Sequence, residues 1–298
     1  MKKNNKQLNF FYKKSKAEVI ENLIEKKLKF KIPKTYSFTV DQWNNQKKLV
    51  IRNITKKFKN KKLIAIRSSS KSEDNLNSSN AGKFLSLLNL KIISKKIILA
   101  VNSIIRSYKK KKKNEDQVFV QEMVSNVSVS GVLFTKDVDT GLNYYVINYD
   151  DITGKTDTVT SGRGEHSNRT LFIFKKFGKK IKSPRFKKLI DCVTDLEKII
   201  NNNSIDIEFA ITKSLKPYLF QVRPITTFKK WKKVSVKEHE KYLLIAEKKL
   251  QKIFKGSENI LGKNTILGQM PDWNPVEMLG KYPSELSYSL YSKLITDN

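Results

Sequence analysis

Two neighbouring stretches decide the fold of this chain: Ile205-Asp206-Ile207-Glu208-Phe209-Ala210-Ile211 and Tyr218-Leu219-Phe220-Gln221-Val222-Arg223-Pro224. Their alternation of apolar and polar residues predicts the two arms of one antiparallel hairpin, with Thr212 to Pro217 as its loop. We expect Ile211 to pair with Tyr218. This register predicts two polar cross-strand pairs, Asp206 with Arg223 and Glu208 with Gln221.

The four polar side chains are expected on one face of the hairpin, because opposed residues and residues two apart on a strand share a face. The apolar side chains of Ile207, Phe209, Phe220 and Val222 are expected on the other face, toward a core. Carboxylate oxygens hold Mg²⁺ and the planar fork of Arg grips phosphate, so the polar face predicts a metal and polyphosphate site. A surface hairpin with a simple Asp206–Arg223 ion pair explains the same pattern equally well at this point.

Composition indicates a globular protein with a basic surface. The 298 residues, 39% of them hydrophobic, can fill one large domain or two modest ones. The formal net charge of +32 is of a size seen in nucleic-acid-binding proteins, but only seven of the 60 basic residues are Arg. Lysine is spread through nearly every segment together with Asn and Ile, as an A/T-rich coding sequence would produce. This distribution disfavours nucleic acid as a partner.

The cysteine count and the hydropathy pattern bear on the compartment. Cys192 is the only cysteine, which excludes an internal disulfide and a cysteine metal site and indicates a reducing compartment. No segment approaches the roughly 18 uninterrupted apolar residues of a membrane span, and the basic N-terminus leads into no signal-peptide core. We therefore expect a cytoplasmic protein with no membrane partner.

Helix and strand patterns alternate along the chain. Helices are predicted at 16–30, 41–58 with Asp41 as the cap, 94–110, 184–201 and 237–254. Strands are predicted at 63–66, 84–90, 118–124, 132–135, 144–149 and 171–174, in addition to the hairpin. This order predicts an α+β (α/β) nucleotide-enzyme fold, with a boundary near residue 228.

A hydroxyl-rich stretch, Arg67-Ser68-Ser69-Ser70, comes directly after the predicted strand at 63–66, and Ala81-Gly82 closes the polar segment that follows. An Arg at a strand end with small residues nearby can cradle a phosphate, because backbone N–H groups can approach the anion closely. Polar loops of this composition are common, and taken alone the stretch favours an ordinary flexible loop.

Five segments in order resemble one protein family. They are Ile66-Arg67-Ser68-Ser69-Ser70 with Ala81-Gly82-Lys83-Phe84, then Val120-Gln121-Glu122-Met123-Val124, then Ser130-Gly131-Val132-Leu133-Phe134-Thr135, then Asp206-Ile207-Glu208, and last Gln221-Val222-Arg223-Pro224-Ile225. Together they resemble the N-terminal ATP-binding domain of phosphoenolpyruvate synthase and pyruvate phosphate dikinase, over residues 14–225. The resemblance implies an ATP-grasp fold of two lobes, at about 1–117 and 118–228, that close over ATP. Residues 229–298 would then be a helical extension and the start of a linker.

The resemblance also implies a role for each matched residue. Arg67, Glu208 and Arg223 would be catalytic and contact the phosphates, and Asp206 and Glu208 would hold Mg²⁺. The ATP-binding set would be Lys16, Arg67, Gly82, Ser86, Gln121, Met123, Glu208, Gln221 and Arg223. Within it, Gly82 and Ser86 would line the phosphate loop, and Gln121 with the backbone around Met123 would lie at the adenine.

In this family ATP phosphorylates a histidine on a separate swivelling domain. The chain lacks the carrier motif, a His beside Thr-Ser in a glycine-rich turn, and its two histidines, His166 and His239, are more typical of surface residues. We therefore expect the carrier histidine on another chain or in a missing C-terminal region. The end at Asn298 is expected to reflect a split or truncated polypeptide.

Two alternatives stay open beside this Mg·ATP-dependent phosphotransferase. The first is a catalytically idle nucleotide-binding or assembly subunit. The second is charge-driven nucleic-acid binding, which would collapse with salt and ignore ATP. The final phosphoryl acceptor is chosen by domains outside this chain, so the fold does not identify it.

Overall fold

The computed structural model describes residues 10–11, 14–70, 85–108, 115–154, 169–225, 235–254, 279–280 and 282–296. They belong to two compact units, Met1–Lys232 and Lys233–Asn298. The second unit begins five residues after the boundary of 228 expected from the sequence. Within the described residues, no helix combines the length and the apolar character needed to cross a membrane.

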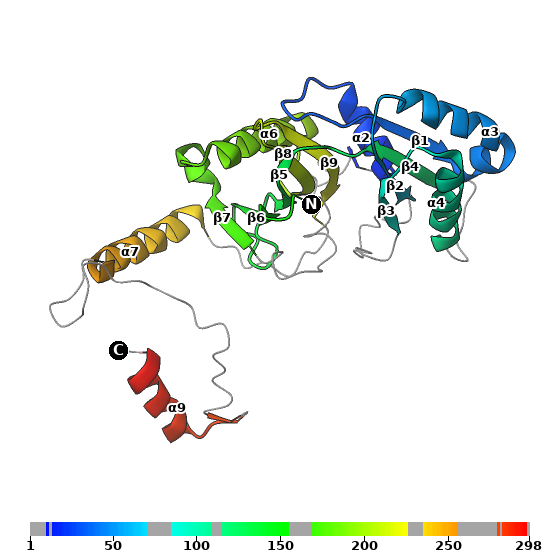
Figure 1. Cartoon of the computed structure of the whole chain (residues 1–298). Coiled ribbons are helices and arrows are strands. Elements are labelled where there is room, and N and C mark those ends of the chain that lie inside the picture. Colours follow the sequence, from blue (N-terminus) through cyan, green and yellow to red (C-terminus); the bar gives the residue numbers. More distant parts are fainter. Residues whose placement is uncertain are drawn as a thin grey trace. The chain divides into compact units, whose positions relative to one another are not determined.

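The first unit contains two antiparallel sheets in its described part (Figure 1). The first sheet has the order β1-β4-β2-β3, with β1 at Thr35–Thr39, β4 at Gln117–Glu122, β2 at Ile64–Ser69 and β3 at Ser86–Leu90. The second has the order β7-β6-β5-β8-β9, with β7 at Arg169–Phe174, β6 at Tyr144–Asp150, β5 at Val127–Phe134, β8 at Ile205–Thr212 and β9 at Pro217–Pro224. The expected mixed α+β class is confirmed.

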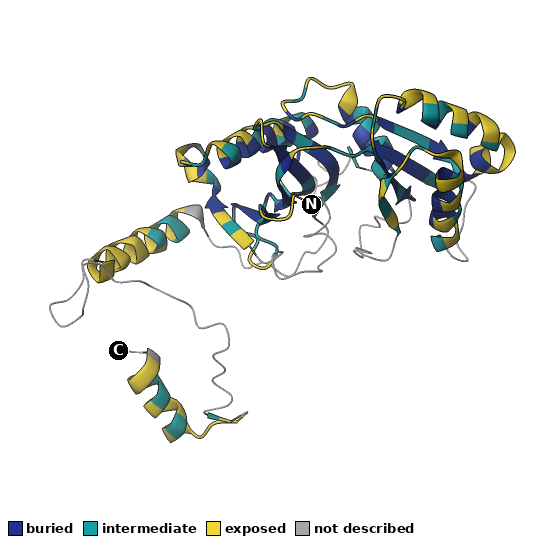
Figure 2. Cartoon of the chain, viewed as in Figure 1, coloured by how far each residue is buried: buried dark blue, intermediate teal, exposed yellow. Residues whose placement is uncertain are grey.

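Each sheet has its own apolar core on one face. Helices α3 (Val40–Lys57) and α4 (Ser94–Ser107) pack on the first sheet around Trp43, Ile54 and Ile104. Helices α2 (Lys16–Ile24) and α6 (Pro184–Ile200) contribute to the core of the second sheet, and η3 (Lys175–Lys180) precedes α6. Figure 2 shows the buried residues as two groups, one along each sheet. We call these bodies the first lobe and the second lobe.

The division between the lobes differs from the expected one at 117/118. Strand β4 pairs with β1 and β2, so it belongs to the first sheet, and the chain crosses to the second sheet only between Glu122 and Val127. Helix α2 was expected in the first lobe but belongs to the second, because Ala17, Ile20 and Leu23 lie in the core of the second lobe. The chain therefore passes between the lobes twice, once before β1 and once after β4.

The first predicted helix is shorter than expected and ends at Ile24 instead of residue 30. The residues beyond it turn and bend as far as Phe30 and then form a strand-like bridge at Lys31, and Leu28, Phe30 and Ile32 contact the core of the second lobe. Their spacing of two residues is typical of extended chain, since alternate side chains then point to one side. Lys31 confirms this conformation, because its backbone bonds to β9 at Pro217 and Leu219, each at 2.9 Å.

Helix α3 is capped by Thr39, so the expectation of Asp41 as the cap is wrong. The Thr39 side chain accepts a hydrogen bond from Gln42 N at 3.1 Å, and the Gln42 side chain accepts one from Thr39 N at 2.9 Å. Threonine followed three residues later by glutamine is the sequence signature of a capping box. Asp41 lies in the first turn, where its negative charge suits the helix dipole.

Two strands of the first sheet differ from the prediction. Strand β1 was not predicted, although its aromatic and β-branched residues favour a strand. Strand β2 continues to Ser69, so Arg67 lies inside the strand and not at its end. Pairing with β4 explains the extension, since Arg67, Ser68 and Ser69 lie opposite Phe119, Val118 and Gln117.

The described part of the second unit is helical. Helix α7 spans Val236–Phe254, α9 spans Glu285–Tyr291 and η4 spans Ser292–Thr296. Helix α7 confirms the charged helix expected at 237–254.

Gly131 in the middle of β5 marks a close approach of two strands. A Cβ atom at this position would lie 2.1 Å from the carbonyl oxygen of Asn148 on β6. We expect Gly131→Ala to lower the free energy of unfolding by about 1–3 kcal/mol, because the backbone must move to remove the clash. Urea unfolding measures this. Gly178→Ala is the control, since its Cβ would meet side-chain atoms no closer than 3.4 Å, and an equal loss in both variants would contradict the prediction.

Candidate active site

The hairpin of β8 and β9 brings the polar residues together in the expected pairs. Asp206 lies opposite Arg223 and Glu208 lies opposite Gln221. The pairing of Ile211 with Tyr218 is wrong, however, because Ile211 pairs with Pro217. A bulge between Glu208 and Phe209 shifts the register by one residue. The pairs from the start of β8 to Glu208 therefore agree with the prediction, and those from Phe209 to the loop differ from it by one residue.

The bulge also changes the apolar faces. Ile207, Phe209, Leu219 and Val222 lie in the core of the second lobe. Phe220, expected on that face, belongs to a separate small cluster with Val127 and Ala210. The one-residue shift turns the side chain at 220 to the opposite side and Leu219 takes its place in the core.

Arg67 reaches this hairpin from the first lobe. Its Nη1 atom lies 2.9 Å from Glu208 Oε2, a hydrogen-bonded ion pair between residues 141 positions apart. Both side chains are largely buried, with 14% and 15% of their surface exposed. The two sheets therefore meet here through a buried ion pair, next to Phe119 of β4, which lies opposite Arg67 and belongs to the core of the second lobe.

Arg223 adds a second guanidinium to the cluster. Its Nη2 atom lies 3.4 Å from Asp206 Oδ2 and 3.8 Å from Glu208 Oε1. Glu208 thus lies between two arginines that come from different lobes. Burial alone would raise the pKa of Glu208, but the charges of Arg67, Arg223 and Lys16, with the hydrogen bond from Arg67, hold it below its ordinary value.

Two buried donors of the cluster have no hydrogen-bond partner among the described residues: Arg67 Nε and Gln221 Nε2. Gln221 is 5% exposed. A buried N–H group without an acceptor is costly, and such groups are rare in folded proteins. Both donors are therefore positioned to receive oxygen atoms of a ligand.

Lys16 stands at the first position of α2, close enough for its charge to lower the pKa of Glu208. The start of α2 is fixed by a capping box of Ser15 and Glu18. Ser69 ties it to the first sheet, since its hydroxyl accepts a hydrogen bond from Ala17 N at 2.9 Å. Sequence reasoning missed this positioning role of Ser69, although its spacing of two residues from Arg67 places both on one face of β2.

The other residues of the predicted ATP-binding set that the structure describes lie in the first lobe and where the chain passes from β4 to β5. Ser86 lies directly opposite Arg67 on β3 and is exposed, so it shares the face of the cluster. Gln121 is buried, and its amide nitrogen contacts the carbonyl of Phe220 at 3.4 Å, which links β4 to β9. Met123 begins the crossing, and its N–H bonds to Leu63 O at 3.1 Å. Gly82 lies outside the described residues.

Sequence reasoning also missed the part of β5 and β6 that extends the polar face of the hairpin. Val132 lies opposite Glu208, Phe134 lies opposite Asp206, and Asn148 of β6 lies opposite Val132. The alternation of residues 130–134 about Gly131 is the signal for this face. The face therefore carries apolar surface next to its charged end.

The donor set of the cluster suits a hard cation that shares its ligands with another molecule. Asp206 and Glu208 supply two carboxylates, and no group of three or more metal-binding side chains occurs in the described part of the chain. Mg²⁺ commonly uses one or two carboxylates, with substrate phosphates and water completing the shell. The cluster thus fits Mg²⁺ bound together with a polyphosphate.

The lowered pKa of Glu208 makes a prediction about stability. A depressed pKa in the folded state stabilises the fold above the ordinary value near 4.5, and this contribution is lost as pH falls through the folded-state pKa. We expect Glu208→Gln to lower the free energy of unfolding near pH 7 by up to about 3–5 kcal/mol, because it leaves buried arginines unneutralised.

The cost of Glu208→Gln should shrink in acid, where the native carboxylate also takes up a proton. Urea unfolding from neutral pH into the acid range measures both effects. Glu25→Gln, an exposed carboxylate at the end of α2, is the control and should change little. A cost for Glu208→Gln that is independent of pH would contradict the assigned charge environment.

A comparison with curated proteins finds no match for the chain. Among solved structures, D-alanine–D-alanine ligase from Helicobacter pylori is similar at 10% identity and a TM-score of 0.40, over 70% of this chain and 50% of that one. PH1788 from Pyrococcus horikoshii is similar at 14% identity and a TM-score of 0.46, over 74% and 96%. A RimK domain ATP-grasp protein from Sphaerobacter thermophilus is similar at 9% identity and a TM-score of 0.37, over 75% and 62%.

The chain spans about half the length of the D-alanine–D-alanine ligases it matches. The family described as pyruvate phosphate dikinase, AMP/ATP-binding domain, matches residues 37–242, which is more than half of the chain. The resemblance found in the sequence motifs is thereby confirmed, as is the ATP-grasp fold class. The protein belongs to the pyruvate phosphate dikinase AMP/ATP-binding domain family.

Proposed function

We propose that this chain binds Mg·ATP at the Arg67–Glu208 cluster and transfers a phosphoryl group to a histidine on a separate domain or partner chain. The observation that carries the proposal is the meeting of Arg67 from one lobe with Glu208 and Arg223 from the other. A site made by two lobes gains its full set of contacts only when both hold the same ligand. Polyphosphate binding is the function that such a set of charges supports best.

The cationic groups would hold the phosphates. The guanidinium groups of Arg67 and Arg223 can each donate two parallel hydrogen bonds to phosphate oxygens, and Lys16 adds a point charge at the start of α2. Arg67 Nε and Gln221 Nε2, for which the described residues offer no acceptor, would complete the phosphate contacts. Gly82 and Ser86 would line the phosphate loop.

Asp206 and Glu208 would hold Mg²⁺ against the same phosphates. The ion, when bound there, would offset negative charge on the phosphates as the transferred group leaves. Gln121 and the backbone around Met123 would lie at the adenine, where the chain crosses between the lobes. The apolar residues Val132 and Phe134 extend the same face and suit contact with the nucleoside.

The transfer itself needs little covalent chemistry from this chain. A histidine nitrogen forms a bond to phosphorus, the bond from phosphorus to the leaving oxygen breaks, and that oxygen keeps the electron pair. Arg67 and Arg223 would stabilise the charge on the transferred group while the lobes exclude water. Only the carrier supplies the histidine. The final acceptor is chosen outside this chain.

Single substitutions test the binding site. We expect Arg67→Ala, Glu208→Ala and Arg223→Ala each to weaken Mg·ATP binding by about tenfold or more, because each removes a charged contact to the phosphates or their metal. Isothermal titration measures the dissociation constants. Arg185→Ala is the matched control, since it removes an arginine paired with Asp151 outside the cluster. Unchanged affinity in all three cluster variants would remove the proposed site.

A phosphotransfer assay separates the proposed enzyme from an idle nucleotide-binding subunit. We expect the chain, mixed with a candidate carrier protein and ATP labelled on its phosphates, to produce acid-labile and base-stable phosphohistidine on the carrier. The carrier with its histidine replaced by alanine is the control. Tight ATP binding without any transfer to a competent carrier would favour the idle subunit.

A further inference from the structure

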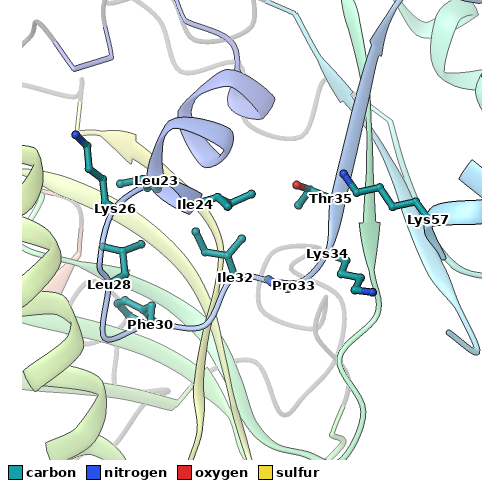
Figure 3. A pocket seen from close by; sticks show the side chains of 10 residues that line it. All are labelled: Leu23, Ile24, Lys26, Leu28, Phe30, Ile32, Pro33, Lys34, Thr35 and Lys57. Atoms are coloured by element: carbon teal, nitrogen blue, oxygen red, sulfur yellow. The ribbon is translucent and has the colours of Figure 1, made fainter. Parts of the chain in front are cut away.

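The first unit carries a cavity whose lining contains no residue of the Arg67–Glu208 cluster. It has a volume of about 380 Å³ and lies where α2 ends and the chain runs toward β1. Its lining residues are Leu23, Ile24, Lys26, Leu28, Phe30, Ile32, Pro33, Lys34, Thr35 and Lys57 (Figure 3). We call it the inter-lobe pocket. None of its lining residues takes part in the proposed ATP site.

The walls of the inter-lobe pocket come from both lobes. Leu28 and Ile32 are packed against the core of the second lobe. Thr35 opens β1, and Lys57 ends α3, both in the first lobe. Figure 3 shows the Lys57 side chain extending toward Thr35, while Leu28, Phe30 and Ile32 lie on the segment that leads from α2 to Thr35. A ligand held here would contact both lobes at once.

The chemistry of the lining is that of an amphipathic anion site. The floor is apolar, and Ile24 at its edge leaves 50% of its surface exposed. Three lysines, Lys26, Lys34 and Lys57, also line the pocket, and none of them forms an ion pair with a carboxylate of the described residues. Lys57 Nζ lies 5.8 Å from the centre of the Tyr36 ring, a weak cation–π contact that leaves its charge available to an anion. Cavities of a few hundred cubic ångströms that are mostly apolar, with a few polar groups, are typical of small-molecule sites.

We propose that the inter-lobe pocket binds a small molecule with an apolar body and one anionic head group, held by Lys57. The apolar body would cover Ile24, Leu28 and Ile32, and the head group would pair with the ammonium group of Lys57, which has no carboxylate partner among the described residues. A carboxylate and a phosphate monoester both have this chemistry, and binding experiments can distinguish them.

The position of the pocket links it to the two crossings between the lobes. Lys34, on its lining, accepts a hydrogen bond from Glu122 N at 2.9 Å, and Lys34 N donates to Glu122 Oε2 at 3.3 Å. Glu122 ends β4 and directly precedes Met123, so the two crossings are bonded to each other beside the pocket. A ligand in the pocket would therefore bias the arrangement of the lobes and alter ATP affinity. This second step rests on the proposed function.

Direct binding tests the site without ATP. We expect octanoate or octyl phosphate to bind the full chain, and octanol, which lacks the charge, to bind much more weakly. Lys57→Ala should weaken binding by about tenfold, because it removes the charged contact to the head group. Lys56→Ala is the matched control, since Lys56 is exposed on the same helical turn and does not line the pocket.

A cavity-filling change separates the pocket from general attraction to a basic surface. Leu28→Trp keeps every lysine and fills the apolar floor, so it should abolish binding while circular dichroism and thermal melting show a folded chain. Absence of binding to the wild type, equal binding of octanol, or equal losses in Lys56→Ala and Lys57→Ala would overturn the site.

The coupling is measured by titrating Mg·ATP with and without saturating octanoate. A changed ATP dissociation constant, lost in Leu28→Trp, supports the link, and reciprocity requires ATP to change octanoate affinity by the same factor. Octanoate binding with unchanged ATP affinity would overturn the coupling. Failure of ATP to bind at all would instead count against the proposed function, because the octanoate measurement is made without nucleotide.

Discussion

The contact between Arg67 and Glu208 is the constraint on which the organisation of the first unit depends. Each residue lies on a strand whose other face belongs to the apolar core of its own lobe. Charged groups with only about 15% of their surface exposed need partners, and here each lobe supplies the partner of the other. The lobes thus meet through a buried ion pair, and beside it Phe119 of β4 packs into the core cluster of the second lobe.

The same contact explains how the cluster can exist without a ligand and still accept one. Glu208 lies 2.9 Å from Arg67 and 3.8 Å from Arg223 and offsets the charge of both, while Arg67 Nε finds no acceptor in the part of the chain that the structure describes. In the proposed complex, phosphate oxygens would take the place of Glu208 at the arginines, and a cation would take the place of the arginines at the carboxylates. Replacing the ion pair by a ligand would cost little further desolvation, because the charged side chains of Arg67 and Glu208 are already largely removed from water. The ion pair therefore keeps the charged groups preorganised.

Much of this site could be predicted from the sequence, because strand pairing obeys simple parity. The spacing of 206 with 208 and of 221 with 223 placed four polar groups on one face, and the structure has these pairs. The bulge beside Phe209 was not predictable, since it depends on how Leu219 and Phe220 compete for space in the core. The shortened first helix had a visible signal in the spacing of Leu28, Phe30 and Ile32. The packing of α2 in the second lobe had no signal in the sequence, because it depends on contacts between segments that are far apart along the chain.

The distribution of basic residues adds an argument about the net charge of +32. Four of the seven arginines, Arg67, Arg169, Arg185 and Arg223, form ion pairs with carboxylates of the described residues. Arginine suits such positions because its planar group donates several hydrogen bonds in a fixed geometry, while lysine is a strongly hydrated point charge. Lysines on the surface can be numerous without taking part in specific contacts. Lys61 and Lys175 are exceptions, since they pair with Glu122 and Glu197. Most of the excess positive charge is therefore surface lysine, whereas four of the seven arginines take part in ion pairs.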